Sequence, residues 1–370
     1  MQQFELLIDP ITGDDLETYT IEKHTLKNGK EIIKTGFLYS KPSKILYPII
    51  NAVPILLTFK TPLTENFLKE YENLLSATEL KEYHLPNLEP MKGEQSIQTT
   101  FTEEWGALGD DEITFAYDEE QGVALHKDVW LRMKDEELES KKMVLDVGCG
   151  FGKEAKYLAT IFPNAKVVAI DLNLAVIRAG IDLLETDRIF PVVASLFKIP
   201  LKDSSFDHVH CQGVIHHTFS TEEGFYSIEK KVNDEGSIFI WVYAWEDSFG
   251  IKGIRGVLVH IYWFISHRIF RPILSRSPAF IRNPIIYLIS ILYHPFVMNR
   301  GINKGRNWKL ENTVHGIRDM FTPMYADRLR FNEVLAWFEK MRYTVQVQSP
   351  LTYEKLFKHR LLGIGYLGRK

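Results

Sequence analysis

The chain has 370 residues, which is long enough for two domains or for one elaborated domain. Its composition, 45% hydrophobic and 25% charged, predicts a globular protein with a sizeable core. A net charge of −4 gives no general attraction to phosphate backbones and argues against a nucleic-acid-binding protein without a local basic patch. The two cysteines, Cys149 and Cys211, do not suggest a disulfide framework. The N-terminus lacks the basic-then-apolar pattern of a secretion signal, so we expect a cytoplasmic protein.

Residues 1–60 predict a small β-rich domain. Strand-like alternation of apolar and polar residues is found in EIIKTGFLYS (31–40) and in ILYPIINAVPILL (45–57), and Asn28-Gly29 predicts a hairpin turn. Residues 61–142 are more polar. Apolar positions at helical spacing in 63–80 predict a helical linker. Within it, the aromatic segment FTEEWGAL (101–108) is either a lid or, through Trp105, a packing anchor between domains.

The most informative stretch is MVLDVGCGFGKEA, residues 143–155. A short apolar run predicts a buried strand, which breaks into a glycine loop at 148–152 and continues into a helical pattern. Glycines let a ligand approach the main chain, and amide groups at the start of the helix face that ligand. The third glycine of a dinucleotide fingerprint would fall at Lys153. The next predicted strand ends on Asp171, at roughly the ~20-residue interval typical of a carboxylate that binds ribose hydroxyls.

From Met143 onward, strands and helices alternate regularly, which predicts a parallel sheet with right-handed crossovers. The predicted strands are 143–147, 166–170, 189–194, 206–211 and 237–243, and the helices between them are 153–162, 174–185 and 221–232. A long insertion, 244–330, precedes a helix at 331–341. Strands at 343–348 and 361–368 would complete seven strands, one of them antiparallel.

The glycine loop, Asp171 and IPLKDSSFDHVHCQGVIHHT (199–218) together resemble the class I S-adenosylmethionine-dependent methyltransferases over residues 143–243. The resemblance implies a Rossmann-like seven-stranded core and S-adenosylmethionine as cofactor. The cofactor-binding residues that it implies are Asp146, Gly148, Cys149, Gly150, Gly152, Asp171, Leu172, Ser195, Leu196, Gln212 and Gly213. Asp146 would steady the loop and the amino group of the cofactor, and Asp171 would accept its ribose hydroxyls. Relatives usually place an aspartate for the adenine amino group where this chain has Ser195.

Residues 1–60 resemble the small zinc-ribbon-like domain that is fused to, or partnered with, many methyltransferases. The ending YPIINAVPILL (47–57) carries this resemblance. The two C-x-x-C pairs of the ribbon align on Asp9 and Thr12 and on Ser40 and Ser43, so the spacing survives without a thiolate. Because structural zinc requires thiolate or imidazole ligands, we expect a ribbon without metal.

Two groups of polar residues are candidates for work on the methyl acceptor. His216 and His217 follow the predicted strand at 206–211, where the sheet would open onto a ligand crevice, and either could deprotonate a hydroxyl. Packing or helix capping is the alternative for each of them. A second cluster, His315, Asp319 and Tyr325, resembles the segment that closes over small-metabolite acceptors, and an equally good reading is that it ties the insertion to the core.

The insertion is unusually apolar. Its runs 256–270 and 283–298 are shorter than the ~18 to 20 uninterrupted apolar residues that a membrane-spanning helix needs, and arginines flank or interrupt them. We expect buried helices that cover the active site. The alternative is a pair of helices that lies on a membrane through residues 256–298.

These observations predict a ribbon-like domain (1–60), a helical linker and lid (61–142), a cofactor-binding core (143–243), an apolar insertion (244–330) and the end of the core sheet (331–370). The expected activity is methyl transfer to an oxygen or nitrogen of a small or medium-sized metabolite, such as a sugar, a lipid-linked compound or a natural-product intermediate. Methylation of RNA is one rival, because zinc-ribbon partners serve enzymes of translation. A non-catalytic scaffold that keeps the cofactor fold is the other.

Overall fold

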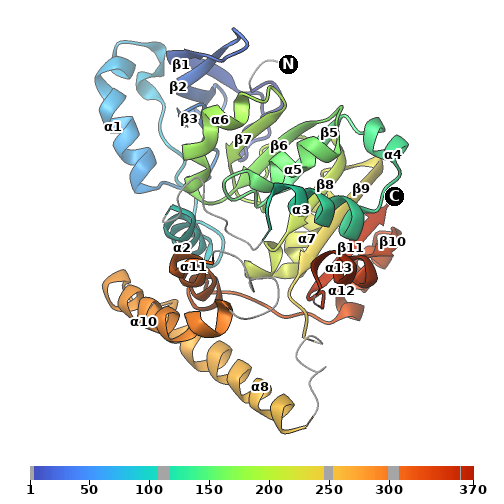
Figure 1. Cartoon of the computed structure of the whole chain (residues 1–370). Helices are drawn as coiled ribbons and strands as arrows, with labels where there is room; N and C mark the ends of the chain where they lie inside the picture. Colours follow the sequence, from blue (N-terminus) through green and yellow to red (C-terminus); the bar gives the residue numbers. More distant parts are fainter. Residues whose placement is uncertain (1–3, 107–116, 246–252, 299–307, 359) are drawn as a thin grey trace. The chain divides into compact units, whose positions relative to one another are not determined.

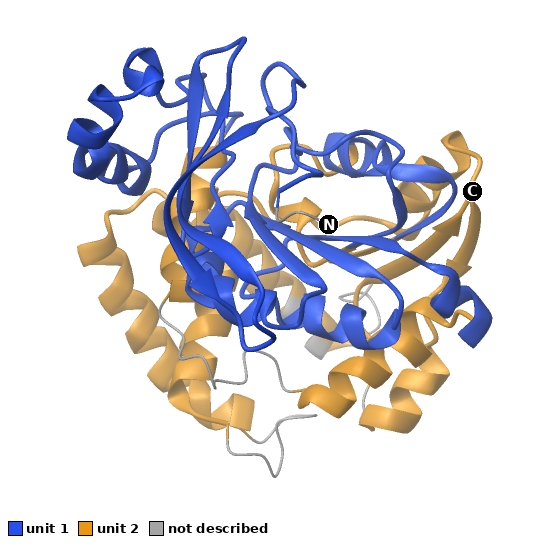
Figure 2. Ribbon diagram, turned by 90° about the horizontal axis from the view of Figure 1, so that it is seen from above, with its two compact units in different colours: residues 1–92, 135–210, 223–238 blue, residues 93–134, 211–222, 239–370 orange. Residues whose placement is uncertain are grey.

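The structure is a computed structural model and describes residues 4–106, 117–245, 253–298, 308–358 and 360–370. Its Cα positions form two compact units, each made of several chain segments. Unit 1 contains residues 1–92, 135–210 and 223–238, and unit 2 contains residues 93–134, 211–222 and 239–370 (Figure 2). The predicted lid segment 101–108 ends outside the described residues.

Unit 1 begins with a four-stranded antiparallel sheet. Its strands, in spatial order, are β1 (Glu17–Thr25), β2 (Glu31–Ser40), β3 (Ile45–Ile50) and β4 (Val53–Pro54). Thr25 pairs with Glu31 across the Asn28-Gly29 turn, which confirms the predicted hairpin. No bounds for β1, the strand before this turn, were predicted from the sequence. The structure also corrects the single strand expected at 45–57, since the chain reverses at Asn51 and Ala52, whose φ angles are 48° and 65°.

A helix pair covers this sheet. α1 (Pro62–Ser76) begins at Thr61, whose side chain accepts a hydrogen bond from the amide of Thr64 in a capping box. The 3₁₀ helix η1 (Glu79–Glu82) follows. Phe67 of α1 packs edge-on against Phe37 of β2, with ring centroids 5.3 Å apart. Both rings belong to one buried apolar cluster, which supplies this sheet with its own core.

The second sheet has seven strands (Figure 1). Their spatial order is β10 (Thr344–Val347), β11 (Ile364–Arg369), β9 (Val232–Val242), β8 (Phe206–Gln212), β5 (Met143–Val147), β6 (Lys166–Asp171) and β7 (Ile189–Val193). β5 pairs in parallel with β6 and β8, and β6 pairs in parallel with β7. β10 and β11 pair antiparallel. The seven predicted strands are therefore all present.

Some predicted boundaries are wrong. β9 begins at Val232 rather than Ser237, because α7 (Thr221–Glu229) ends before the residues that the helical pattern had included. The helix expected at 174–185 is a 3₁₀ helix, η3 (Leu174–Ala179), followed by α6 (Gly180–Leu184). The other helices of unit 1 are α4 (Asp135–Ser140) and α5 (Lys153–Ile161).

The N-terminal sheet joins the edge of the larger sheet within unit 1. Ile55, just after β4, forms a parallel bridge with Val193 of β7, and the amide of Leu56 donates to the carbonyl of Val193 at 2.8 Å. The side-chain amide of Asn51 donates to the carbonyl of Ile177 at 2.7 Å. A Cβ at Gly180 would lie 2.1 Å from the carbonyl oxygen of Asn51, so this turn can reach α6 only where glycine stands.

Unit 2 is mostly helical. Its helices before the insertion are α2 (Glu94–Gly106), α3 (Glu119–Ala124), the π-helical turns η2 (Leu125–Leu131) and the 3₁₀ turn η4 (Ile215–His217). The insertion forms α8 (Ile254–Ile265), η6 (Ser266–Phe270), α9 (Arg271–Leu274), α10 (Ala279–Met298) and α11 (Leu310–Phe321). α12 (Phe331–Lys340) matches the predicted helix, and α13 (Pro350–Phe357) was not expected.

Candidate active site

The glycine loop between β5 and α5 is held closed by backbone hydrogen bonds. The amides of Gly148 and Cys149 both donate to the carbonyl of Ile170, at 2.8 and 3.1 Å. Gly148, Gly150 and Gly152 have φ angles of 83°, 55° and 83°, in the left-handed region that favours glycine. The loop therefore presents main chain without side chains at three positions, next to the N-terminus of α5.

Asp171 ties this loop to the end of β6. Its Oδ2 accepts a hydrogen bond from the amide of Gly150 at 2.8 Å, and its Oδ1 accepts one from the amide of Asn173 at 2.8 Å. A carboxylate oxygen has capacity for a second donor, so both oxygens can still receive hydroxyl groups. Burial raises the pKa of Asp171 to about 6, although the two amide hydrogen bonds favour its ionised form.

Asp146 of β5 supports the fit of a cofactor with an amino group. Its side chain is buried, and no described residue donates a hydrogen bond to its Oδ2. Burial raises its pKa well above the ordinary value, and the nearby Glu154 and Asp171 add to this. A buried acceptor without a donor costs about 1–3 kcal/mol. An ammonium group beside the glycine loop would supply the missing donor, so the residues fit the amino group of S-adenosylmethionine.

The other predicted cofactor residues of unit 1 lie at neighbouring strand ends. Leu172 directly follows Asp171 and is half-buried. The amide of Ala194 donates to the carbonyl of Asp171 at 2.8 Å, which places Ser195 and Leu196 just beyond β7. The hydroxyl oxygen of Ser195 accepts from the amide of Phe197 at 3.1 Å, and its own proton remains available for a ligand. Cys149 is fully buried, so it would offer a ligand its main chain only.

Gln212 and Gly213 belong to unit 2. Gln212 is the last residue of β8 and is half-buried. Gly213 has a φ of 72°, and its amide donates to the carbonyl of Trp241 at 2.9 Å. A Cβ at Gly213 would meet no atom within 4 Å. Glycine is thus favoured there by its backbone conformation and not by crowding.

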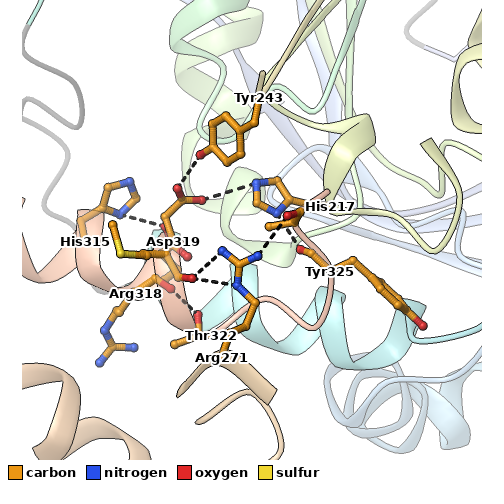
Figure 3. A network of polar contacts seen from close by, with 11 residues as sticks. His217, Tyr243, Arg271, His315, Arg318, Asp319, Thr322 and Tyr325 are labelled. Carbon is orange, nitrogen blue, oxygen red and sulfur yellow. Dashed lines mark hydrogen bonds and ion pairs between the residues drawn. The ribbon is translucent and has the colours of Figure 1, made fainter. Parts of the chain in front are cut away.

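The polar residues that the sequence singled out in unit 2 form one cluster around Asp319 (Figure 3). Tyr243, just after β9, donates its hydroxyl proton to Oδ2 of Asp319 at 2.7 Å. Nε2 of His217 lies 3.6 Å from Oδ1 of the same carboxylate. Nδ1 of His217 lies 2.9 Å from the carbonyl oxygen of Tyr325. Because a carbonyl only accepts, Nδ1 carries the proton and the lone pair of neutral His217 is on Nε2.

His216 and His217 have different surroundings. The ring of His216 is 0% exposed and lies 4.0 Å from the ring of Tyr243, centroid to centroid. Neither of its nitrogens makes a hydrogen bond with any residue in the described part of the chain. Burial lowers its pKa well below the ordinary value, with His217, Arg271 and Arg328 adding repulsion. Burial also lowers the pKa of His217, but Asp319 acts in the opposite direction. The geometry therefore favours packing for His216 and proton transfer for His217.

Arg271 fixes the segment that orients His217. Its Nε and Nη2 donate to the carbonyl of Met320 at 2.8 and 2.6 Å, and its Nη1 donates to the carbonyl of Ala326 at 3.1 Å (Figure 3). Burial lowers the pKa of Arg271 to about 10. The guanidinium thus holds both ends of the turn that contains Tyr325. Sequence reasoning missed Arg271 and Tyr243 as site residues. Arg271 was interpreted only as one of the arginines that flank the apolar runs, and Tyr243 only as the end of a strand.

A second buried pair lies on the other side of the cluster. Nδ1 of His315 on α11 is 3.3 Å from Oε1 of Glu104 on α2. Burial raises the pKa of Glu104 well above its ordinary value and lowers that of His315 to about 4. The ring of Trp105 packs edge-on against His315 at 5.2 Å. Residues from the predicted lid segment and from the end of the insertion are therefore brought together.

Three of the four aligned ribbon positions, Asp9, Ser40 and Ser43, meet around the carboxylate of Asp9. Asp9 accepts hydrogen bonds from the hydroxyls of Tyr47 at 2.7 Å and Ser43 at 2.8 Å, and from the amide of Ile11 at 2.8 Å. The amide of Ser43 lies 3.4 Å from the hydroxyl of Ser40. Within the described residues, no group of three or more His, Cys, Asp or Glu side chains is placed to hold a metal ion.

Comparisons with known proteins agree with this geometry. Residues 145–240 match the methyltransferase domain family. The chain is 31% identical over 105 residues to an uncharacterized protein of Synechococcus, matching 27% of this chain and 25% of that protein. It is 32% identical over 98 residues to a malonyl-[acyl-carrier protein] O-methyltransferase of Legionella pneumophila, matching 26% of this chain and 34% of the enzyme. The chain thus spans about a quarter to a third of the length of these relatives.

Among solved structures, a Burkholderia thailandensis 1,6-didemethyltoxoflavin N1-methyltransferase with bound S-adenosylhomocysteine is similar with a TM-score of 0.42 and 15% identity. The match covers 77% of this chain and 92% of that chain. Asp146 lies in strand β5, and the glycine loop directly follows this strand. Both belong to unit 1 and fall within residues 145–240, which match the methyltransferase domain family. The family match identifies residues 145–240 as a methyltransferase domain.

Proposed function

We propose that this protein transfers a methyl group from S-adenosylmethionine to an oxygen or nitrogen of a small or medium-sized metabolite. The carrying observation is the buried acceptor of Asp146, which lacks a donor among the described residues and lies beside a loop with glycine at three positions. The Legionella relative is an O-methyltransferase by name, which supports oxygen as the methylated atom. Sugars, lipid-linked compounds and natural-product intermediates are the acceptor types that we consider.

The bound cofactor supplies a methyl group on a positively charged sulfur, which is already activated toward displacement. The protein's contribution is therefore mainly positioning and the exclusion of water. The glycine loop lets the ligand approach the main chain closely, Asp171 offers its two oxygens to the ribose hydroxyls, and Asp146 offers its Oδ2 to the amino group.

An acceptor hydroxyl or ammonium must lose a proton when it is methylated. Nε2 of His217 can receive this proton because Nδ1 is committed to the carbonyl of Tyr325. The imidazolium that forms would face Oδ1 of Asp319, whose other oxygen is held by Tyr243. The Asp319 side chain is 31% exposed, so the proton has a route to solvent.

Calorimetry with S-adenosylhomocysteine tests the cofactor assignment without an acceptor. Asp146→Asn keeps the shape of the side chain but removes the charge that attracts the amino group. We expect an affinity roughly 10- to 100-fold lower, the loss of one charged hydrogen bond. Asp182→Asn, an exposed aspartate of α6 in the same unit, is the matched control and should bind normally. Tight binding of NAD, or an unchanged affinity in Asp146→Asn, would contradict the assignment.

The two rival functions make different predictions. An RNA methyltransferase would retain RNA in a salt-dependent manner. A scaffold without activity would show no affinity for S-adenosylhomocysteine. We therefore expect S-adenosylhomocysteine to bind to the purified protein and RNA not to be retained.

A further inference from the structure

Exposed apolar side chains are concentrated on α8, η6, α9 and α10. The described residues include 28 large hydrophobic side chains that are exposed, and 19 of these lie between Ile254 and Met298. Phe280 is 77% exposed and Ile254 is 73% exposed. Soluble proteins scatter such residues singly, and a larger apolar surface usually marks an interaction site.

The same part of the sequence lacks acidic residues. From Ser248 to Leu310 there is no Asp or Glu, and there are ten basic residues: Lys252, Arg255, Arg268, Arg271, Arg276, Arg282, Arg300, Lys304, Arg306 and Lys309. The rest of the chain contains the other 34 of the 44 basic residues and all 48 acidic residues. A chain that is otherwise acidic therefore has a strongly basic segment where its exposed apolar residues lie. Of the described basic side chains, Arg268, Arg276 and Lys309 are exposed.

Among the described residues of unit 2, α10 packs along one of its faces. Arg282, Ile286 and Ser290, spaced four residues apart, are buried. Ile286 shares an apolar cluster with Ile317 and Phe321 of α11. The polar contacts of this side are an ion pair of Arg282 with Glu103 and a 2.8 Å hydrogen bond between His294 and Thr313.

The opposite face of α10 is apolar and exposed. It includes Phe280, Leu288, Leu292 and Phe296, which are between 58% and 77% exposed. α10 is the one described helix that is long and apolar enough to cross a membrane, a weak indication by itself. One side of α10 packs against α2 and α11, and both of these helices carry charged residues. If α10 crossed a membrane, those charges would be buried in lipid.

We propose that the exposed faces of α8, η6, α9 and α10 bind an anionic lipid bilayer and lie in its headgroup region. Amphipathic helices with an apolar face and basic residues, but no acidic ones, are suited to such surfaces. The apolar side chains enter the acyl boundary, and the exposed Arg268 and Arg276 stay at the level of the lipid phosphates. A second copy of this chain is a poorer occupant, because two segments of the same positive charge would face each other.

This surface lies close to the polar cluster of unit 2. Ile317 and Phe321 of α11 pack toward α10, whereas His315 and Asp319 are two residues away and so lie on the opposite side of the helix. One helix, about 10 Å in diameter, therefore separates the proposed membrane surface from the cluster. Such an arrangement suits an acceptor with a lipid tail, a refinement that rests on the proposed function.

Vesicle flotation of the full-length protein tests the membrane surface independently of methyl transfer. We expect the protein to float with vesicles that contain about a third phosphatidylglycerol and much less with phosphatidylcholine alone, and to be released by salt in part. Leu288→Glu combined with Leu292→Glu should lower partitioning on the order of 10²-fold or more, since each side chain loses its burial. Arg268→Glu combined with Arg276→Glu should lower it by at least about 20-fold.

Leu351→Glu on α13 is the matched control, because Leu351 is 81% exposed but lies outside the segment. It should float like the wild type. Circular dichroism and the affinity for S-adenosylhomocysteine should be unchanged in every variant, which separates failure of this surface from failure of the proposed cofactor site. Equal binding to neutral vesicles, RNA retention by the basic segment, or dimerisation that the α10 variants abolish without any vesicle binding would overturn the proposal. Resistance to extraction at alkaline pH would also overturn it, in favour of a membrane-spanning helix.

Discussion

The amide of Gly150 donates to Oδ2 of Asp171 at 2.8 Å, so the carboxylate expected to bind the ribose also holds the glycine loop in place. The other oxygen of Asp171 accepts from the amide of Asn173. The Asp171 side chain thus adds to the backbone hydrogen bonds from Gly148 and Cys149 to Ile170, which already join the loop after β5 to the end of β6. Substitutions at Asp171 should therefore affect both the ligand contacts and the shape of the loop.

Asp171→Asn should weaken binding of S-adenosylhomocysteine by about 10²-fold, as expected for loss of one to two charged hydrogen bonds. An asparagine has one oxygen, whereas the backbone presents two donors, from Gly150 and Asn173. One of these amides would face the NH₂ group and lose its acceptor. Isothermal calorimetry measures the loss, with Asp182→Asn as control. Wild-type affinity in Asp171→Asn would show that this carboxylate does not contact the ligand.

Cofactor affinity should depend on pH around the pKa of Asp171. Burial raises this pKa to about 6, and the ionised form is the acceptor of hydroxyl protons. Affinity should thus be full above pH 6 and fall as the pH drops through 6, by up to about tenfold per unit for a single proton. Asp146 acts in the same direction, because its pKa is also raised and an amino group binds its ionised form. A titration by calorimetry should show this dependence, reduced in Asp171→Asn. A pH-independent affinity would contradict it.

His217→Asn should lower turnover by about 10²- to 10⁴-fold and leave the affinity for S-adenosylhomocysteine intact. The imidazole is oriented by the carbonyl of Tyr325 and faces Asp319, and asparagine cannot take up the proton. His216→Phe is the matched variant, since His216 is packed among rings without hydrogen bonds in the described residues. It should retain most of the activity. Full turnover in His217→Asn would assign a packing role to both histidines.

Arg271→Lys should destabilise the protein by about 3 kcal/mol, because lysine cannot reproduce three hydrogen bonds to two carbonyls. Lysine keeps the positive charge, so the loss of stability measures what the hydrogen-bond geometry of the guanidinium contributes. Urea unfolding followed by circular dichroism measures the free energy of unfolding. Arg276→Lys, at an exposed arginine of the same segment, is the control and should cost little. If both variants were equally stable, Arg271 would not fix the turn around Tyr325.

The N-terminal four-stranded sheet should be stable without metal and should depend on Asp9 instead. Burial opposes ionisation of Asp9, but hydrogen bonds from Ile11, Tyr47 and Ser43 outweigh it and lower the pKa. Its contribution is therefore present above the ordinary pKa of 3.8 and is lost as the pH falls below that value. Asp9→Ala should cost about 2–4 kcal/mol, since buried Tyr47 loses its partner.

Asp15→Ala, at a side chain that is 91% exposed, is the matched control for Asp9→Ala. Elemental analysis should find no stoichiometric zinc, and a chelator should leave the melting temperature unchanged. One equivalent of zinc released together with unfolding would refute the metal-free interpretation.

The sequence by itself determined the strands of the core sheet and the positions along the chain of the residues expected to bind the cofactor. The apolar runs and the glycine spacing located β5, β6 and the loop between them, because strand burial and left-handed glycines are local properties. Asp146 and Asp171 were found for the same reason, since each stands in or at the end of one of these strands.

Only the tertiary structure decided which distant residues meet. Tyr243, Arg271 and Asp319 are separated by tens of residues. The hydrogen bond from Tyr243 to Asp319 and that from Arg271 to the carbonyl of Met320, the residue after Asp319, depend on how α9 and α11 pack. The reversal at Asn51 and Ala52 was hidden in a run that is apolar on both sides of the turn. The sequence also did not determine which faces of α8 and α10 are exposed. An apolar helix has the same sequence pattern whether it is buried in the protein or exposed to bind a partner.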